Sequence, residues 1–382
     1  MKKRKIAVTT GTRAEYGILR LVLDEIKISK KLELLLIVTG SHFSKKHGMT
    51  VNEIKADGHK IAAKVDMLPK INSEFESTKI IGNAIVSFSK IFKKLKPDIN
   101  LILGDRDEML ASAIAAYHMN IPNAHIHGGD KSGGLDEYTR HAITKLSNIH
   151  FAATKKSAKR ILQMGEKSEF IFHTGSPSID QILKNKITKK TELEKKYKIK
   201  ITGNEILLLQ HPVTTELDET EIQIIETLNA IVKLKKRTII VGSNLDPGND
   251  IIYKNLIKFA DRYDFIKFYP TLPRNDYLGF LKNCGVLVGN SSSGIIEASF
   301  FKKPVVDIGI RQRFREKGPN VIDVKYFDQK SIFSAIVKAL KLKSNKLKYS
   351  SIYGKSNVSK KIIKHLERIK LNRELLQKQI TY

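Results

Sequence analysis

The sequence predicts an α/β protein made of two Rossmann-like, doubly wound domains, and three observations lead to this fold class. Short apolar runs recur along the chain, each followed by Gly, Ser or Asp and then by a segment with helical periodicity. The pattern occurs twice, and a polar, lysine-rich passage from about Ile182 to Asn204 separates the two occurrences. Because ligands bind beyond the carboxyl ends of parallel strands, we expect an interdomain cleft lined by the loops that follow the strands.

The domain boundaries follow from this repeat. A first Rossmann-like domain is expected over residues 1–182, and a linker region over residues 183–204. A second Rossmann-like domain is expected over residues 205–365. The last segment, 366–382, is expected as a C-terminal helix that can pack back on the N-terminal domain.

The strands are predicted from apolar runs, since strands that are buried on both faces are nearly continuously apolar. In the first domain these runs are Ile6–Thr10, Leu34–Thr39, Ile99–Leu103, Ile121–Ile126 and Phe151–Thr154. In the second domain they are Ile206–Gln210, Thr238–Val241, Val286–Val288 and Pro304–Ile308. The amphipathic segments that predict helices between them include Asp107–Met119, Ser157–Met164, Glu216–Leu234 and Asn249–Arg262.

Composition excludes several classes of protein. The 382 residues are 41% apolar and 28% charged, which is typical of globular chains rather than disordered ones. No apolar stretch approaches about 18 residues, so we expect no membrane association. The chain starts with a basic segment that no long apolar region follows, so we expect no signal peptide and a cytoplasmic location. The single cysteine, Cys284, excludes an internal disulfide and a cysteine-based zinc cluster.

The charge balance allows two interpretations. The chain has 68 Lys and Arg against 39 Asp and Glu, a formal net charge of +29. Such a surplus can indicate a nucleic-acid-binding protein. The lysines are spread among isoleucines, however, and no zinc finger, aromatic RNA-binding strand or long basic block accompanies them. We therefore favour a lysine-rich composition over solvated faces, and expect no nucleic-acid partner.

The first loop whose residues suit ligand binding is Gly11–Gly17, which follows the first predicted strand. Its glycines allow a tight turn, and the amides that open the next helix can face an anion. The segment lacks the GxGxxG pattern, so binding of a nicotinamide dinucleotide is disfavoured. Arg13 can pair with phosphate in a bidentate manner, or it can be an ordinary surface arginine near a turn.

Two further loops in the first domain are rich in charged side chains. The run Gly104–Glu108 places Asp105 and Arg106 directly after a strand, where Asp105 can either cap a helix or transfer protons. The segment His125–Asp130 (HIHGGD) supplies histidines and a carboxylate, and Leu135–His141 (LDEYTRH) supplies Asp136 and Glu137 close by. A metal site made of His125, His127 and Asp130 is the rival interpretation.

In the second domain, His211 follows a predicted strand, where a histidine can either belong to a functional site or pack in the core. The segment Gly289–Glu297 (GNSSSGIIE) follows another strand and opens a helix. Its hydroxyls and amides can hold a diphosphate, and Glu297 can accept both hydroxyls of a ribose. Simple capping by a serine is the alternative, although it explains one of the three serines.

Taken together, these motifs resemble the UDP-N-acetylglucosamine 2-epimerase family, particularly its hydrolysing branch. They lie in the family's order and cover most of the chain: GTRAE at Gly11, GDR at Gly104, HIHGGD at His125, DE followed by RHAITKLS at Asp136, HPVTT at His211, GNSSSG with Glu297, and GIRQ with Arg315-Glu316. The resemblance implies a GT-B-like fold, in which the C-terminal domain binds the nucleotide.

The resemblance also implies a reaction, conversion of UDP-GlcNAc and water to N-acetylmannosamine and UDP by anti elimination to 2-acetamidoglucal and hydration. Such a reaction serves the synthesis of sialic-acid-type sugars. It implies roles in catalysis for Asp105, Asp136, Glu137 and His211. It implies substrate or nucleotide binding by Arg13, Arg106, Asn244, Arg274, Ser291, Ser292, Ser293, Glu297 and Arg311. We expect no metal and no other cofactor, and the family suggests a homodimer or a larger homo-oligomer.

One departure concerns the HIHGGD loop, because some members of the family carry a glutamate where this chain has His127. Either other carboxylates transfer the proton, or His127 does so itself. Three alternative functions stay open: the same chemistry on UDP-N,N'-diacetylbacillosamine or GDP-GlcNAc, a non-hydrolysing 2-epimerase, and a GT-B glycosyltransferase.

Overall fold

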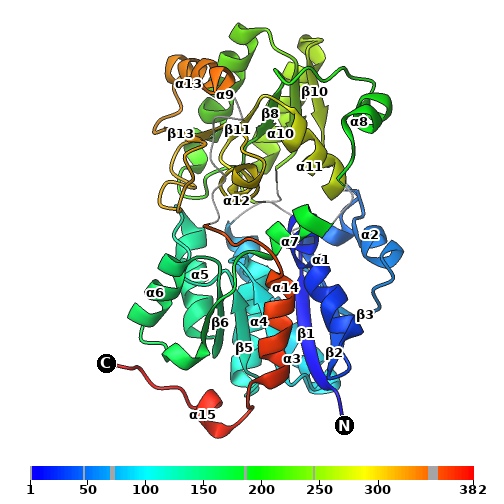
Figure 1. Ribbon diagram of the computed structural model, residues 1–382, viewed down its shortest axis with the longest axis vertical. Helices are drawn as coiled ribbons and strands as arrows, with labels where there is room; N and C mark the ends of the chain where they lie inside the picture. Colours follow the sequence, from blue (N-terminus) through cyan, green and yellow to red (C-terminus); the bar gives the residue numbers. More distant parts are fainter. Residues whose placement is uncertain (1, 46–47, 69–73, 185–186, 244–245, 343–351) are drawn as a thin grey trace. The chain divides into compact units, whose positions relative to one another are not determined.

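The computed structural model of the chain describes residues 2–45, 48–68, 74–184, 187–243, 246–342 and 352–382. It divides into two compact units, each with its own parallel sheet (Figure 1). The N-terminal unit comprises Met1–Asp130, Asp136–Leu183 and Ile352–Tyr382. The C-terminal unit comprises Lys131–Leu135 and Lys184–Ser351.

The sheet of the N-terminal unit has, among the described residues, seven parallel strands in the order β3-β2-β1-β4-β5-β6-β7. These strands are β1 (Arg4–Thr10), β2 (Leu32–Val38), β3 (Ile61–Lys64), β4 (Ile99–Leu103), β5 (Asn123–Ile126), β6 (Ile149–Ala152) and β7 (Ile171–His173). The order reverses direction between β1 and β4, as it does in Rossmann folds.

Helices cover both faces of this sheet. They are α1 (Arg13–Ile28), α2 (Val51–Ala56), α3 (Glu74–Leu95), α4 (Asp107–His118), α5 (Leu135–Lys145), α6 (Lys155–Gln163), α7 (Pro177–Lys184), α14 (Val358–Arg368) and α15 (Arg373–Leu376). Successive residues of β1 point to opposite faces. Ile6 and Val8 pack in the cluster formed with α1 and α14, whereas Ala7 packs with α3 and α4.

The sheet of the C-terminal unit has six parallel strands within the described ranges, in the order β10-β9-β8-β11-β12-β13. They are β8 (Ile206–Leu209), β9 (Thr238–Val241), β10 (Ile266–Tyr269), β11 (Val286–Gly289), β12 (Val305–Ile308) and β13 (Val321–Val324). The helices are α8 (Lys190–Tyr197), α9 (Thr220–Leu234), α10 (Asn249–Arg262), α11 (Arg274–Asn283), α12 (Ser292–Phe300) and α13 (Gln329–Lys341). The predicted fold class, two doubly wound α/β domains, is confirmed.

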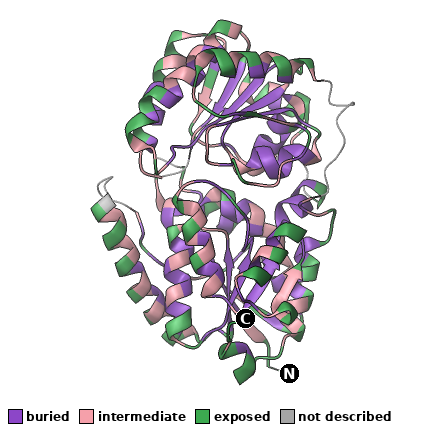
Figure 2. Ribbon diagram, turned by 90° about the vertical axis from the view of Figure 1, so that its left-hand side faces the viewer, coloured by how far each residue is buried: buried purple, intermediate pink, exposed green. Residues whose placement is uncertain are grey.

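Most strands were predicted because their burial makes them apolar along their whole length. Figure 2 shows this burial in both sheets, while the helices expose their outer faces. The four strands without a sequence prediction are β3, β7, β10 and β13, which are the edges of the two sheets. Edge strands are only partly buried here, so their sequences carry no long apolar run. No helix in the described part of the chain is both long enough and apolar enough to cross a membrane.

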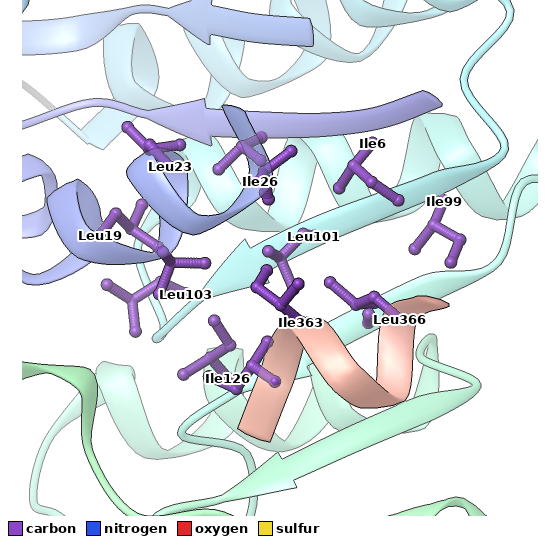
Figure 3. Packing of buried hydrophobic residues seen from close by; sticks show 14 of the residues in the cluster. Ile6, Leu19, Leu23, Ile26, Ile99, Leu101, Leu103, Ile126, Ile363 and Leu366 are labelled. Atoms are coloured by element: carbon purple, nitrogen blue, oxygen red, sulfur yellow. The ribbon is translucent and has the colours of Figure 1, made fainter. Parts of the chain in front are cut away.

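The boundaries of the two units differ from the expected domains at two places. Helix α8 lies in the C-terminal unit, where Leu193 is fully buried, so this part of the expected linker 183–204 belongs to a domain. Helix α14 lies in the N-terminal unit, although residues up to 365 were expected in the second domain. The physical reason is the apolar face of α14, which packs against α1 and the sheet (Figure 3).

We expect Leu366→Ala to destabilise the N-terminal unit by about 2–5 kcal/mol, because Leu366 is 0% exposed and truncation leaves a cavity. Leu371→Ala is the matched control, since Leu371 is 39% exposed. Hydrogen exchange followed by mass spectrometry should show faster exchange in β1 and β4 and unchanged exchange in β8 and β11. Faster exchange in β8 and β11 alone would show that α14 stabilises the C-terminal unit, and would contradict its assignment to the N-terminal unit.

Candidate functional site: two sets of polar loops

The residues proposed from the sequence follow the central strands of each sheet. Arg13 follows β1, Asp105 follows β4 and His211 follows β8, while the serine-rich segment at Ser291 follows β11. Strand order reverses between β1 and β4 and again between β8 and β11. At such a point the crossover helices leave to opposite faces, so the carboxyl ends of the two strands stay open to a ligand. Each unit therefore carries one set of candidate residues at its reversal point.

The turn after β1 is closed by a capping box. The Thr12 side chain accepts from the Glu15 amide, and the Glu15 carboxylate accepts from the amides of Gly11 and Thr12 at 2.9 and 3.0 Å. Arg13, the expected phosphate ligand, forms an ion pair with Glu53 of α2. Its role in phosphate binding stays a prediction.

A second carboxyl group lies against the same turn. A Cβ at Gly11 or at Gly40 would lie 2.6 Å from Oε1 of Glu108, so this carboxyl group packs directly against both glycines. Burial, together with the nearby charge of Glu108, raises the pKa of Glu15 to about 8. Arg106 donates from Nε to Glu108 at 3.2 Å. The turns after β1 and β4 thus meet at a buried pair of carboxyl groups.

Asp105 is held by a buried arginine rather than left in solvent. Arg140 of α5 forms an ion pair with the Asp105 carboxylate, and Nη1 of Arg140 donates to the Asp130 carbonyl at 3.0 Å. Nη1 also lies 3.6 Å from Oε2 of Glu137. Glu137 accepts a further contact from His141 at 3.1 Å, and Asp136 lies beside it in the first turn of α5. Two of the predicted carboxylates, Asp105 and Glu137, therefore lie beside one guanidinium.

The two histidines of the HIHGGD loop face different partners. Nε2 of His125 lies 2.7 Å from the Gly104 carbonyl, and burial lowers the pKa of His125 to about 3, so the ring is neutral and donates this bond. His127 has a left-handed backbone, with φ of 67°. Its Nε2 lies 2.9 Å from Oγ of Ser176 and its Nδ1 3.5 Å from the Asp130 carboxylate. Within the described ranges, no three His, Cys, Asp or Glu side chains are placed to share a metal ion.

In the C-terminal unit, one asparagine joins three loops. The side chain of Asn290 donates to the His211 carbonyl at 2.9 Å and accepts from the His211 amide at 2.7 Å. The Asn290 carbonyl accepts from Gln312 at 3.2 Å and from Arg311 at 3.4 Å. These hydrogen bonds join the ends of β8 and β11 to the loop after β12. His211 and Arg311 therefore both lie at the carboxyl ends of the strands of this sheet.

The three serines at the start of α12 have different contacts. Ser291 is the N-cap and accepts from the Ser293 amide, and Ser292 opens the helix. The hydroxyl of Ser293 instead donates to Glu297 and receives a hydrogen bond from Tyr277 at 2.6 Å. Glu297 is also paired with Arg274. The Ser293 hydroxyl therefore contacts Glu297, and its role in nucleotide binding stays a prediction. Asn244 lies outside the described residues.

One known protein family matches most of this chain. A family model described as UDP-N-acetylglucosamine 2-epimerase matches residues 24–367. The chain belongs to this family. It is thus an enzyme of the nucleotide-sugar 2-epimerase kind, and the resemblance inferred from the motifs is confirmed.

Individual relatives of the family cover nearly the whole chain. The UDP-N,N'-diacetylbacillosamine 2-epimerase (hydrolyzing) of Legionella pneumophila is 40% identical over 382 residues, which is 99% of this chain and 100% of the relative. The GDP/UDP-N,N'-diacetylbacillosamine 2-epimerase (hydrolyzing) of Campylobacter jejuni is 35% identical and covers 88% of both chains. The crystal structure of UDP-GlcNAc 2-epimerase from Neisseria meningitidis bound to UDP-GlcNAc has a TM-score of 0.81 and 21% identity, over 96% of this chain and 100% of that one. This likeness confirms a GT-B-like fold.

Several residues of this family member were not assigned roles by the sequence analysis. Arg140, Asn290 and Gln312 each lie inside a quoted motif, but their contacts come from other segments of the chain. The sequence signal for Arg140 is its place in a motif beside other charged residues. Glu108 ends the charged run Gly104–Glu108, whereas Ser176 lies outside all of these motifs.

The buried Glu15 carboxyl should make stability depend on pH. The folded protein favours the neutral form up to about pH 8, whereas the unfolded chain releases this proton near pH 4.5. The contribution is therefore complete below about pH 4.5 and is lost as pH rises towards 8. Each pKa unit corresponds to about 1.4 kcal/mol.

Glu15→Gln mimics the neutral form and keeps the carbonyl that accepts from Gly11 and Thr12. We expect the free energy of unfolding of the wild-type protein to fall relative to Glu15→Gln between pH 5 and pH 8 in urea titrations. Glu33→Gln, at an exposed position of β2, should follow the wild type. Parallel curves for Glu15→Gln and the wild type would contradict a neutral Glu15.

Proposed function

We propose that this protein is a hydrolysing 2-epimerase of a UDP-linked 2-acetamido sugar. The observation that carries the proposal is the full-length likeness to hydrolysing 2-epimerases, together with carboxylates after β4 and β5 in one unit and the serine-rich start of α12 in the other. The relatives' names favour UDP-N,N'-diacetylbacillosamine as the first substrate to test. UDP-GlcNAc, the substrate expected from the motifs, is the second.

The proposed reaction has two stages. A base removes the proton from C2 while the C1–O bond breaks and UDP leaves with its electron pair, so that a double bond forms between C1 and C2. Water then adds its hydroxyl to C1, and a proton reaches C2 from the opposite face. The products are UDP and the free 2-epimer. The chemistry needs a base, an acid on the other face of the sugar, and donors for the leaving diphosphate.

The N-terminal unit supplies proton-transfer groups for this reaction. Asp105 is proposed as one of the two, since its side chain remains 20% exposed whereas that of Arg140 is 1% exposed. Asp136 and Glu137 are proposed as the source of the second. His127 is a weaker candidate for proton transfer than its motif suggests, because both ring nitrogens face protein groups. We propose that His127 orients the Asp130 carboxylate instead.

The C-terminal unit supplies the groups proposed to hold UDP. The amides at the start of α12 and the hydroxyls of Ser291 and Ser292 can donate to the diphosphate, with Arg311 providing a positive charge at the same edge. Glu297, oriented by Ser293 and Arg274, can accept the ribose hydroxyls. His211 is proposed to lie at the junction of sugar and diphosphate.

Asp105→Asn and His211→Ala should each lower kcat by about 10²–10³-fold while UDP affinity changes much less. Asparagine keeps the size of Asp105 and removes its basicity, so a purely structural Asp105 would leave turnover near the wild-type rate. The reaction should be run in D₂O with each substrate and followed by NMR. Released sugar with deuterium at C2 and free UDP is expected.

The same spectra separate the alternative functions. A 2-epimer that still carries UDP would identify a non-hydrolysing epimerase, and retention of the C2 hydrogen would contradict the elimination mechanism. Turnover only in the presence of an added acceptor would identify a glycosyltransferase. Each of these results would overturn the proposed function.

Ser292→Ala should weaken UDP binding about tenfold or more, because a hydrogen bond to a charged group contributes roughly 1.5–3 kcal/mol. Isothermal titration with UDP measures this change. Ser331→Ala is the matched control, since Ser331 lies in the first turn of α13 in the same unit. An unchanged affinity in Ser292→Ala would reduce this segment to a helix start without a ligand.

A further inference from the structure

Arg140 is among the most completely buried side chains of the protein, with 1% of its surface exposed. A buried guanidinium requires compensating partners, because removing a charge from water costs several kcal/mol. Its partners here come from three different segments: the turn after β4, the loop after β5, and the first turn of α5. The side chain is too deeply buried to reach a substrate, so its effect must pass through these partners.

The turn that carries Asp105 is fixed at two points. Arg140 pairs with the Asp105 side chain, and the neutral His125 ring donates to the carbonyl of Gly104. Gly104 has a φ of 79°, a left-handed backbone conformation that glycine adopts without strain. One contact comes from β5 and the other from α5. The Asp105 turn is thus positioned by two elements that follow it in the chain.

The planar guanidinium of Arg140 fixes the positions of three acidic residues relative to one another. Its planar fork places one nitrogen on the Asp105 carboxylate and the other on the Asp130 carbonyl, with Glu137 3.6 Å from this second nitrogen. Proton transfer to and from a sugar carbon requires acid and base at defined positions, and a displacement of about 1 Å can cost roughly 10²-fold in rate. A lysine could supply the charge without supplying this fork.

We propose that Arg140 is a positioning residue for the 2-epimerase reaction, which holds the Asp105 carboxylate in a fixed relation to the loop after β5 and to Glu137. This inference rests on the proposed function, since it assigns Asp105 to proton transfer. Arg140 acts through Asp105, so its contribution disappears when Asp105 no longer works as a carboxylate.

A double-mutant cycle tests this dependence. Arg140→Met should lower kcat about 10²-fold with KM and UDP affinity within about threefold of the wild type, and Arg140→Lys should recover only part of the loss. In the Asp105→Asn background, Arg140→Met should change kcat by less than about threefold. Equal losses in both backgrounds, or full activity of Arg140→Met, would overturn the proposal.

Arg160→Met provides the matched control. Arg160 donates to the carbonyl of Gly129 in the same loop, so its substitution loosens the loop while the ion pair between Arg140 and Asp105 stays in place. We expect a smaller loss of kcat that is the same in the wild-type and Asp105→Asn backgrounds. A loss as dependent on Asp105 as that of Arg140→Met would assign the effect to the loop and overturn the role of Arg140.

A measurement without substrate keeps the inference separate from the proposed function. In NMR spectra, the Nη hydrogens of Arg140 should show slow rotation in the wild type and fast rotation in Asp105→Asn, because the ion pair restrains the guanidinium. Identical rotation in both proteins would overturn the positioning role, even if the wild type is an active epimerase. Slow rotation lost in Asp105→Asn, in a wild type inactive on every nucleotide sugar, would reject the proposed function and retain the ion pair.

Discussion

The reversal of strand order at the centre of each sheet is the constraint on which the rest of the structure depends. It leaves the carboxyl ends of β1 and β4 in one unit, and of β8 and β11 in the other, without a crossover helix above them. The loops that follow these strands must satisfy their own backbone groups. They do so with capping side chains and buried charged pairs.

Buried charge is compensated differently in the two units. In the N-terminal unit, the Arg140 guanidinium lies beside the carboxylates of Asp105 and Glu137. The carboxyl groups of Glu15 and Glu108 are buried together because Glu15 is neutral. In the C-terminal unit both oxygens of Glu297 have partners, Arg274 on one and Ser293 on the other. Fully paired groups of this kind are held in one geometry, so they are preorganised when a substrate arrives.

The C-terminal segment completes the N-terminal unit through both apolar and charged contacts. Helix α14 buries its apolar face on α1 and the sheet, and the following residues reach a buried carboxylate. Burial raises the pKa of Glu166, but hydrogen bonds with His150 at 3.2 Å, Lys145 at 2.6 Å and Lys378 at 2.8 Å outweigh it and lower the pKa to about 2. The last part of the chain is therefore structural in this unit, and lies on different elements from the loops proposed for catalysis.

The sequence by itself determined the fold class, the central strands and the family, because buried parallel strands require apolar runs and the motif residues lie next to each other along the chain. It could nominate Asp105 and His211, since their positions after strands are local features. Tertiary structure alone decided that α14 belongs to the first unit and that Arg140 and Asn290 hold these residues in place. Such contacts join segments that are 35 or 79 residues apart, and their partners are chosen by packing and by the pairing of buried polar groups, which no local pattern records.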